Sequence, residues 1–219
     1  MTAWWTAPRL WPGETCFILG GGPSLKGFDA SMLRGRGRVL AINDAGLVMA
    51  PWADCLYFAD RKWFEENLEE IDLYTGPTSG ERLMVTRASD LDAKGRDVKR
   101  MVFCRNQPLA QDRAWLAGRS GGANAINLAV HLGASRIVLL GFDMRPSGNW
   151  HNRHKRPQKA ERYPEAFVPE LYQMAPLLAR TGVQVLNATP GSALTCFAMV
   201  DLEGLLRCLP SPIASTPAP

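Results

Sequence analysis

The sequence predicts an α/β fold in which a mostly parallel sheet is covered by helices on both faces. Short apolar runs alternate with stretches of helical composition through most of the 219 residues. These runs are continuously apolar, which is typical of parallel strands that are buried on both faces. The first run breaks abruptly into three glycines before a short helical stretch, as expected for a strand-to-helix turn.

Seven segments have the apolar, partly β-branched composition of strands: 15–19, 38–43, 55–59, 83–86, 99–104, 136–141 and 183–187. Five further segments have helical composition: 29–33, 62–71, 122–132, 164–180 and 200–208. The helix at 122–132 is apolar and alanine-rich, so we expect it to be buried, with His131 as a core histidine near its end. In such a sheet, ligands bind beyond the carboxyl ends of the strands, near the point where the strand order reverses.

Length and composition indicate one globular domain. With 46% hydrophobic and 21% charged residues, the chain can bury a substantial core. We expect a single α/β domain at 1–208 and a disordered tail rich in Pro, Ser and Ala at 209–219. No apolar run approaches the ~20 residues of a membrane span. The N-terminus lacks the features of a signal peptide, which predicts a cytoplasmic protein.

The cysteines and the distribution of charge indicate which kinds of binding site the chain can contain. The five cysteines form no C-x-x-C pair, which argues against a zinc site and a disulfide framework. Between residues 145 and 162 there are six Lys or Arg residues and one acidic residue, while the whole chain has a net charge of only +4. Basicity confined to one segment favours an anion site over a surface that coats nucleic acid.

The glycine turn is the first candidate site. Gly20, Gly21 and Gly22 end the first strand and are followed by Pro23 and Ser24. Glycines let the backbone approach a phosphate closely, and the free N–H groups at a helix start face the anion. The turn lacks the Lys-Ser/Thr of a P-loop and the spacing G-x-G-x-x-G. The alternative is a tight strand-to-helix turn without a ligand.

Polar residues follow three other predicted strands and are expected to meet the glycine turn in one cleft. Asn43 offers an amide that can read a base or sugar edge. Asp44, Asp60 and Asp143 are carboxylates of the kind that hold Mg²⁺ beside a substrate phosphate. The alternative for each of them is a helix cap.

A second turn of small residues opens the helix at 122–132. Ser120 is a natural N-cap there, followed by Gly121, and Arg119 can counter phosphate charge. Close packing of the buried helix is the alternative reason for the glycines.

The last candidate group lies in a basic loop. His151 and His154 are candidates for a general acid or base, because imidazole titrates near neutrality. Arg153, Lys155 and Arg156 can neutralise a diphosphate or a departing nucleotide phosphate. The alternative is a solvated surface loop.

Taken together, these motifs resemble a known superfamily. Their order resembles that of the bacterial lipooligosaccharide sialyltransferases and the 6-hydroxymethylpterin diphosphokinase-like proteins (domain of unknown function 115). The resemblance runs from about Thr15 to Leu194 and rests on the 18–25 turn, Asn43, the helix start at 120–122 and the segment 140–143. The Trp150-His151 element and the turn at 187–194 look most like the short phage-encoded members.

This resemblance implies a Rossmann-like, nucleotide-binding domain. It implies that Gly21, Gly22, Pro23 and Ser24 line the phosphate and ribose, that Asn43 lies beside the nucleotide, and that Ser120 and Gly121 contact the base or ribose. It further implies that a histidine after the Gly-x-Asp strand is the general base, with His151 as the closest candidate. Asp60 stands where the family pattern has an asparagine.

Three functions follow as hypotheses. The first is a nucleotide-dependent transferase of glycosyltransferase type, with a nucleotide or nucleotide-sugar donor and with His151, Asp143 and Arg153 as catalytic residues. The second is an ATP- and Mg²⁺-dependent diphosphokinase, which requires Asp44, Asp60 and Asp143 to converge. The third is a non-catalytic phage protein that binds nucleotide or nucleic acid. The sequence leaves the acceptor open between a glycan and a modified nucleic acid, and it leaves the oligomeric state open.

Overall fold

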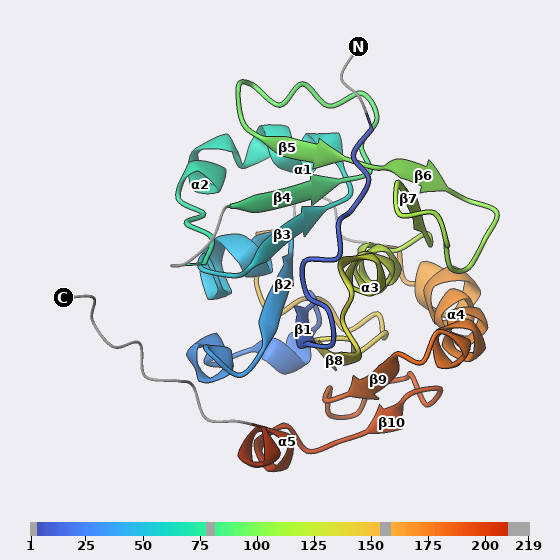
Figure 1. Ribbon diagram of the computed structural model, residues 1–219. Helices are drawn as coiled ribbons and strands as arrows, with labels where there is room; N and C mark the ends of the chain where they lie inside the picture. The colour runs from blue at the N-terminus through green and yellow to red at the C-terminus, as the bar shows by residue number, and fades with distance from the viewer. Residues whose placement is uncertain (1–3, 78–81, 154–158, 210–219) are drawn as a thin grey trace.

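The computed structural model describes residues 4–77, 82–153 and 159–209. Eight strands form one sheet in the order β10-β9-β8-β1-β2-β3-β4-β5, and all neighbouring strands are parallel. A separate parallel pair is formed by β6 and β7. The predicted α/β fold with a mostly parallel sheet is confirmed (Figure 1). The strands are β1 (Thr15–Leu19), β2 (Arg38–Ile42), β3 (Cys55–Phe58), β4 (Leu83–Thr86), β5 (Val98–Arg100), β6 (Val102–Cys104), β7 (Trp115–Ala117), β8 (Arg136–Leu140), β9 (Gln184–Asn187) and β10 (Ala198–Met199).

Helices cover both faces of the sheet. Figure 1 shows α3 and α4 on one side and α1, α2 and α5 on the other. Short 3₁₀ and π-helical turns complete the connections. The helices are α1 (Arg61–Glu66), α2 (Leu68–Asp72), α3 (Gly121–Leu132), α4 (Val168–Arg180) and α5 (Leu202–Cys208), and the turns are η1 (Pro23–Leu25), η2 (Ala30–Leu33), η3 (Ala45–Met49) and η4 (Tyr163–Phe167).

The core has two halves, one on each face of the sheet. On β1, Ile18 packs with the half that contains α3 and α4, whereas Phe17 and Leu19 pack with the half that contains α1, α2 and α5. All three side chains are fully buried. Alternate residues of a strand point to opposite faces, so a strand buried on both faces needs an unbroken apolar run. This explains the composition of the central strands.

One predicted strand is wrong. The segment 99–104 divides into two strands at the buried Met101. The Met101 N–H donates to the Thr86 carbonyl at 2.9 Å, which is the last backbone hydrogen bond of this segment to β4. The next N–H, that of Val102, donates to the Ala114 carbonyl at 2.8 Å, which places β6 beside β7. An apolar run does not reveal that its two halves pair with different partners. Strand β7 lies in a segment for which the sequence predicts no element.

The helix predicted at 62–71 is interrupted at Asn67. Asn67 has φ −127° and ψ 27°, and its side-chain amide donates to the Trp63 carbonyl at 2.7 Å. Asparagine side chains compete with the backbone for such carbonyls, which accounts for two short helices in place of one. The helix predicted at 164–180 begins as the π-helical turn η4 before α4, and the one predicted at 29–33 is a 3₁₀ turn capped by Asp29.

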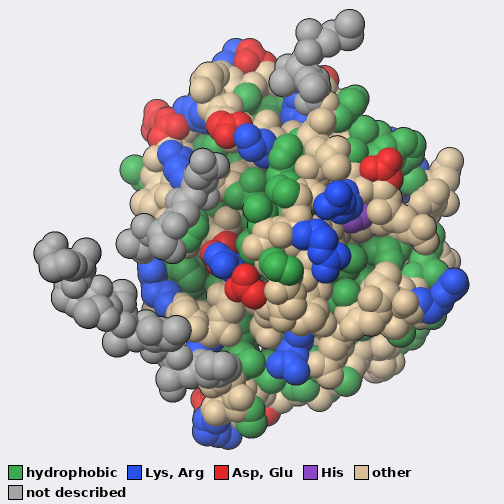
Figure 2. Space-filling model, viewed as in Figure 1, with side chains coloured by type: hydrophobic (Ala, Val, Ile, Leu, Met, Phe, Trp, Pro, Cys, Tyr) green, Lys and Arg blue, Asp and Glu red, His purple; other side chains and the backbone are tan. Residues whose placement is uncertain are grey.

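The predictions about the C-terminal tail, membrane spans and the surface charge can be compared with the structure. Apart from Leu209, the predicted tail at 209–219 lies outside the described residues. In the described part of the chain, each helix is too short or too polar to serve as a membrane span. On the face seen in Figure 2, basic and acidic side chains are interspersed with hydrophobic ones, so this face does not offer a continuous basic surface.

His131 is a buried core histidine, as predicted, and it should make stability depend on pH. Its Nε2 lies 2.9 Å from the Trp115 carbonyl, and burial lowers the pKa of its imidazole below the ordinary 6.5. Below pH 6.5 the unfolded chain therefore binds a proton that the folded chain does not. We expect the unfolding free energy to fall with pH from 6.5 down to the folded-state pKa, by at most about 1.4 kcal/mol per pH unit. Urea unfolding at several pH values should show a smaller slope for His131→Gln, and an unchanged slope would contradict this assignment.

Candidate nucleotide cavity

A cavity of about 240 Å³ lies at the carboxyl edge of the sheet. From the central β1, the early strands β2 to β5 extend to one side and the late strands β8 to β10 to the other. The cavity is lined by residues that follow β1, β2, β3, β4 and β8 and by the start of α3. It therefore occupies the switch point between β1 and β8, where sheets of this type bind ligands.

The three glycines of the first turn have different roles. A Cβ on Gly20 would lie 2.7 Å from the Gly141 carbonyl oxygen, and one on Gly22 would lie 1.8 Å from the Asp143 carboxylate. Close packing against the segment after β8 therefore requires both glycines. A Cβ on Gly21 would meet only the Asn149 Oδ1, at 3.2 Å. Gly20, Gly21 and Asn149 all line the cavity, and Gly21 is the one of the three turn glycines whose Cβ would meet no backbone atom.

Pro23 and Ser24, which the resemblance places at the phosphate and ribose, do not line the cavity. The Ser24 N–H donates to one oxygen of Asp143 at 3.1 Å, and the Ser24 hydroxyl donates to the other at 2.7 Å. Neither Ser24 nor Asp143 lines the cavity, and the Asp143 side chain is buried. The structure thus places Asp143, a predicted catalytic residue, in a bond that ties the end of β8 to the glycine turn.

The start of α3 is held by a residue that the sequence analysis did not single out. Ser120 is the N-cap, as expected, and its hydroxyl accepts from the Ala123 N–H at 3.1 Å. The buried Glu170 carboxylate from α4 accepts from the N–H groups of Arg119 and Ser120 and from the Ser120 hydroxyl. An anion supplied by the chain itself therefore occupies the outermost donors of this helix.

The next two donors of α3 stay open. The first N–H groups of a helix have no intrahelical partner, and those of Gly121 and Gly122 make no hydrogen bond within the described residues. Both residues line the cavity. Helix α3 has 12 residues, so its N-terminal dipole attracts an anion placed there.

The side chain of Asn43 has a buried acceptor without a partner within the described residues. Its backbone is left-handed, with φ 52°, which is uncommon for a residue other than glycine. Its side-chain Oδ1 is buried and accepts no hydrogen bond within the described residues, although the residue lines the cavity. An unpaired buried acceptor costs about 1–3 kcal/mol. A ligand that donates an N–H or O–H here would satisfy it.

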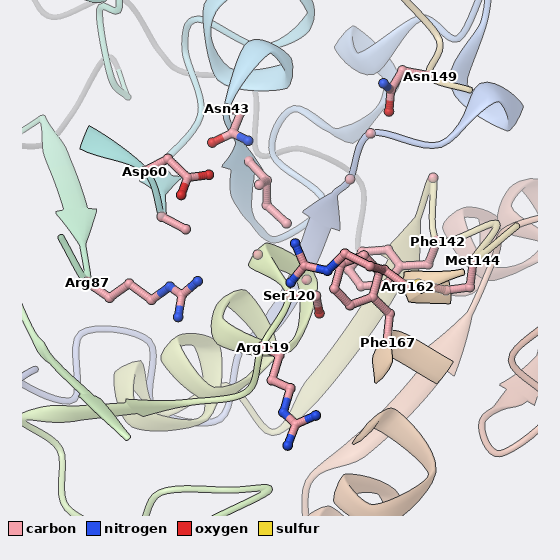
Figure 3. Close-up of a pocket in the computed structure, with 17 residues that line it drawn as sticks. Asn43, Asp60, Arg87, Arg119, Ser120, Phe142, Met144, Asn149, Arg162 and Phe167 are labelled. Carbon is pink, nitrogen blue, oxygen red and sulfur yellow. The ribbon is translucent and has the colours of Figure 1, made fainter. Parts of the chain in front are cut away.

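Three arginines surround the cavity: Arg87, Arg119 and Arg162. The lining carries one acidic side chain, that of the exposed Asp60, which follows β3 and makes no capping hydrogen bond to α1. In Figure 3, Asn43 and Asp60 lie at one end of the cavity and Arg119 at the other. The excess of positive charge suits an anionic ligand.

Arg87 and Arg162 were not predicted from the sequence. Arg87 lies over the Phe103 ring, 3.9 Å from its centroid, and its buried Nε has no hydrogen-bond partner within the described residues. Arg87 directly follows β4, so it shows the same signal as Asn43 and Asp60: a polar residue after an apolar strand. Arg162 precedes η4, and no local pattern marks it.

Of the residues predicted to be functional in the basic loop, the structure describes His151 and Arg153, and neither of them lines the cavity. The Arg153 guanidinium donates to the buried Asp44 at 2.9 Å and to Glu70 at 2.9 Å. The side chain of His151 is only 7% exposed; its Nδ1 accepts from the Arg153 N–H, and its Nε2 lies 3.9 Å from Asp44. Asp44 also accepts from the Trp63 indole at 3.0 Å. These contacts fasten the loop to α1 and α2. His154, Lys155 and Arg156 lie outside the described residues.

The three predicted metal carboxylates do not come together. Asp44 is bound by Trp63 and Arg153, Asp143 is bound by Ser24, and only Asp60 lines the cavity. In residues 4–77, 82–153 and 159–209, no group of three or more His, Cys, Asp or Glu side chains is placed to hold a metal ion. The convergence that the diphosphokinase hypothesis requires is therefore not found among them.

No family model matches the chain, and no curated protein matches its sequence. Among solved structures, it is similar to the sialyltransferase CstII from Campylobacter jejuni in complex with a substrate analogue, cytidine-5'-monophosphate, with a TM-score of 0.54, 15% identity and coverage of 86% of this chain and 85% of that chain. CstII with CMP-3FNeuAc gives a TM-score of 0.55 and 15% identity over 85% and 86% of the two chains. CstII with a trisaccharide acceptor and CMP gives 0.54 and 16% over 84% of each. The chain thus has a sialyltransferase-like, Rossmann-like α/β fold.

Proposed function

We propose that this protein is a nucleotide-dependent transferase of glycosyltransferase type, which takes a nucleotide-sugar donor into the cavity between β1 and β8. Asn43 carries the proposal: it lines that cavity, and its buried amide oxygen has no hydrogen-bond partner within the described residues, which fits a donor supplied by a ligand. The open N–H groups at the start of α3 and the surrounding arginines fit a phosphate. The fold it shares with an enzyme whose structures contain CMP supports the same choice.

Different residues of the cavity bind the phosphate and the nucleoside of the donor. The N–H groups of Gly121 and Gly122, with Arg119 and Arg162, hold the phosphate and stabilise the negative charge that grows on it as the sugar leaves. At the other end, Asn43 and Asp60 accept hydrogen bonds from the nucleoside, whose hydroxyl and amino groups are donors. Binding energy at both ends orients the bond that breaks.

Thermal shift and calorimetry with CMP, UDP, GDP, ADP and ATP, each with and without Mg²⁺, test the proposal. We expect CMP to stabilise the chain without Mg²⁺, by about 2.7 kcal/mol at a concentration of 100 Kd. Release of CMP from a CMP-sugar then tests turnover. If none of the nucleotides stabilises the chain, the proposal is refuted. Stabilisation by ATP with Mg²⁺ alone would favour a diphosphokinase.

Asn43→Gly separates binding from stability. Glycine adopts the left-handed conformation freely and removes the unpaired oxygen, so we expect the unfolding free energy to stay within about 1 kcal/mol of wild type. Loss of a ligand hydrogen bond of about 1.4 kcal/mol would weaken CMP binding about tenfold. Asn149→Ala, which also truncates an amide side chain of the cavity lining, serves as a control for the general shape of the cavity. Equal CMP affinity in Asn43→Gly and wild type would contradict the role given to Asn43.

A further inference from the structure

A second cavity, of about 390 Å³, lies next to the first. It is formed between the segment that follows β6 and the start of α4. The amides of Asn106, Gln107 and Gln173 line it, together with Arg105 and two glutamates. Side-chain amides, carboxylates and guanidinium groups offer both donors and acceptors, which suits a polyhydroxylated ligand.

The two cavities meet at one side chain. Arg119 lines both of them, and in Figure 3 it extends away from Asn43 and Asp60, at the far end of the first cavity. The turn η4 also borders both: Phe167 lines the first, and Glu165 and Ala166 line the second. A ligand in the second cavity would therefore approach the end of the first where we place the phosphate.

The two carboxylates of the second cavity differ in their availability. Glu170 is occupied by three donors from the start of α3. The Glu165 carboxylate makes no hydrogen bond or ion pair within the described residues, and the residue is exposed. Of the two carboxylates, Glu165 is therefore the one whose oxygens have no donor within the described residues.

We propose that the second cavity binds the acceptor, a saccharide alcohol, and that Glu165 is the catalytic base that deprotonates it. This proposal rests on the proposed function. The acceptor oxygen forms a bond to the anomeric carbon of the donor sugar as its hydroxyl proton passes to the Glu165 carboxylate. The bond from that carbon to the phosphate oxygen breaks, and its electron pair leaves with the nucleotide beside Arg119. Glu165 thus replaces His151, which does not line either cavity.

The location is tested without turnover. The isotope-labelled chain is saturated with CMP and titrated with lactose as a saccharide probe, while the side-chain amide signals of Gln107 and Gln173 are followed by NMR. We expect both signals to move, and to move much less in Arg105→Ala. The location would be overturned if lactose leaves both signals unchanged or shifts only signals from other parts of the chain.

The chemistry is tested with Glu165→Gln. Because general bases contribute about 10²–10⁴-fold, we expect kcat for transfer from a CMP-sugar to lactose to fall at least 100-fold, with the CMP Kd unchanged. The acid limb of the kcat/KM pH profile should disappear, and Glu165→Asp should restore part of the rate. Glu161→Gln is the matched control, since Glu161 is exposed and lines neither cavity.

The outcomes separate the two proposals. Wild type that binds no nucleotide would refute the proposed function itself. Wild type that binds CMP, together with a Glu165→Gln variant that keeps its kcat and its acid limb, would refute only the role of Glu165.

Discussion

Gly22→Ala is expected to destabilise the fold by about 3 kcal/mol. Gly22 has φ −70° and ψ 153°, which any residue can adopt, so the cost is steric. The new methyl group would lie 1.8 Å from the Asp143 carboxylate and 2.6 Å from the Gly141 carbonyl oxygen. Relief requires the Asp143 carboxylate to move and to release both Ser24 donors, and such overpacking typically costs 1–3 kcal/mol. Urea unfolding measures the loss.

A double-mutant cycle identifies the clashing group. In the Gly22→Ala background, Asp143→Ala removes the carboxylate that the methyl group meets, so the double variant should be more stable than the sum of the single losses predicts. The rescue should be incomplete because the Gly141 carbonyl remains at 2.6 Å. Strict additivity would contradict the proposed contact.

The neighbouring Gly21→Ala is the matched control. Its Cβ meets only a flexible side chain, Asn149 Oδ1 at 3.2 Å, so its unfolding free energy should stay within about 0.5 kcal/mol of wild type. The methyl group projects into the cavity wall, so CMP affinity should fall about tenfold. If Gly21→Ala were as unstable as Gly22→Ala, or bound CMP as wild type does, the division of roles within the turn would be wrong.

The contrast between Gly21 and Gly22 shows where sequence reasoning stops. The turn contains three consecutive glycines, and the sequence leaves two alternative reasons for each of them: room for a ligand or tight packing. Packing accounts for Gly20 and Gly22, and the cavity leaves room for a ligand at Gly21. The decision depends on Asp143 and Asn149, which lie more than a hundred residues away in the chain. Distances of that kind follow from the fold and not from a local pattern.

The sheet was predictable for the opposite reason. Each central strand can be recognised from its own residues, because a strand buried on both faces must be continuously apolar. Asn43 and Asp60 reach the cavity because they follow such strands, and Arg87 could have been found by the same rule. Glu170 could not, since a glutamate in the first turn of α4 is what any surface helix would show. Its burial and its partners depend on how α4 packs against α3.

The second large effect is expected for Glu170→Ala. This change leaves the N–H groups of Arg119 and Ser120 and the Ser120 hydroxyl without their acceptor. Hydrogen bonds to a charged group contribute about 1.5–3 kcal/mol each, but the second cavity opens beside them and water can replace part of the loss. We therefore expect a net loss of about 3 kcal/mol in the unfolding free energy. Glu69→Ala, an exposed glutamate on α2, should cost less than about 0.5 kcal/mol.

A small anion should repair Glu170→Ala. Truncation leaves a space the size of a carboxylate next to three donors and the positive end of α3, where acetate or formate can bind. We expect sodium acetate to raise the melting temperature of this variant well above the effect of equal sodium chloride, and to leave wild type and Glu69→Ala unchanged. The rescued variant should also regain CMP affinity, because Arg119 and Ser120 return to the positions that Glu170 holds. Acetate that stabilises all three proteins equally would show that Glu170 does not act as the anion of this helix start.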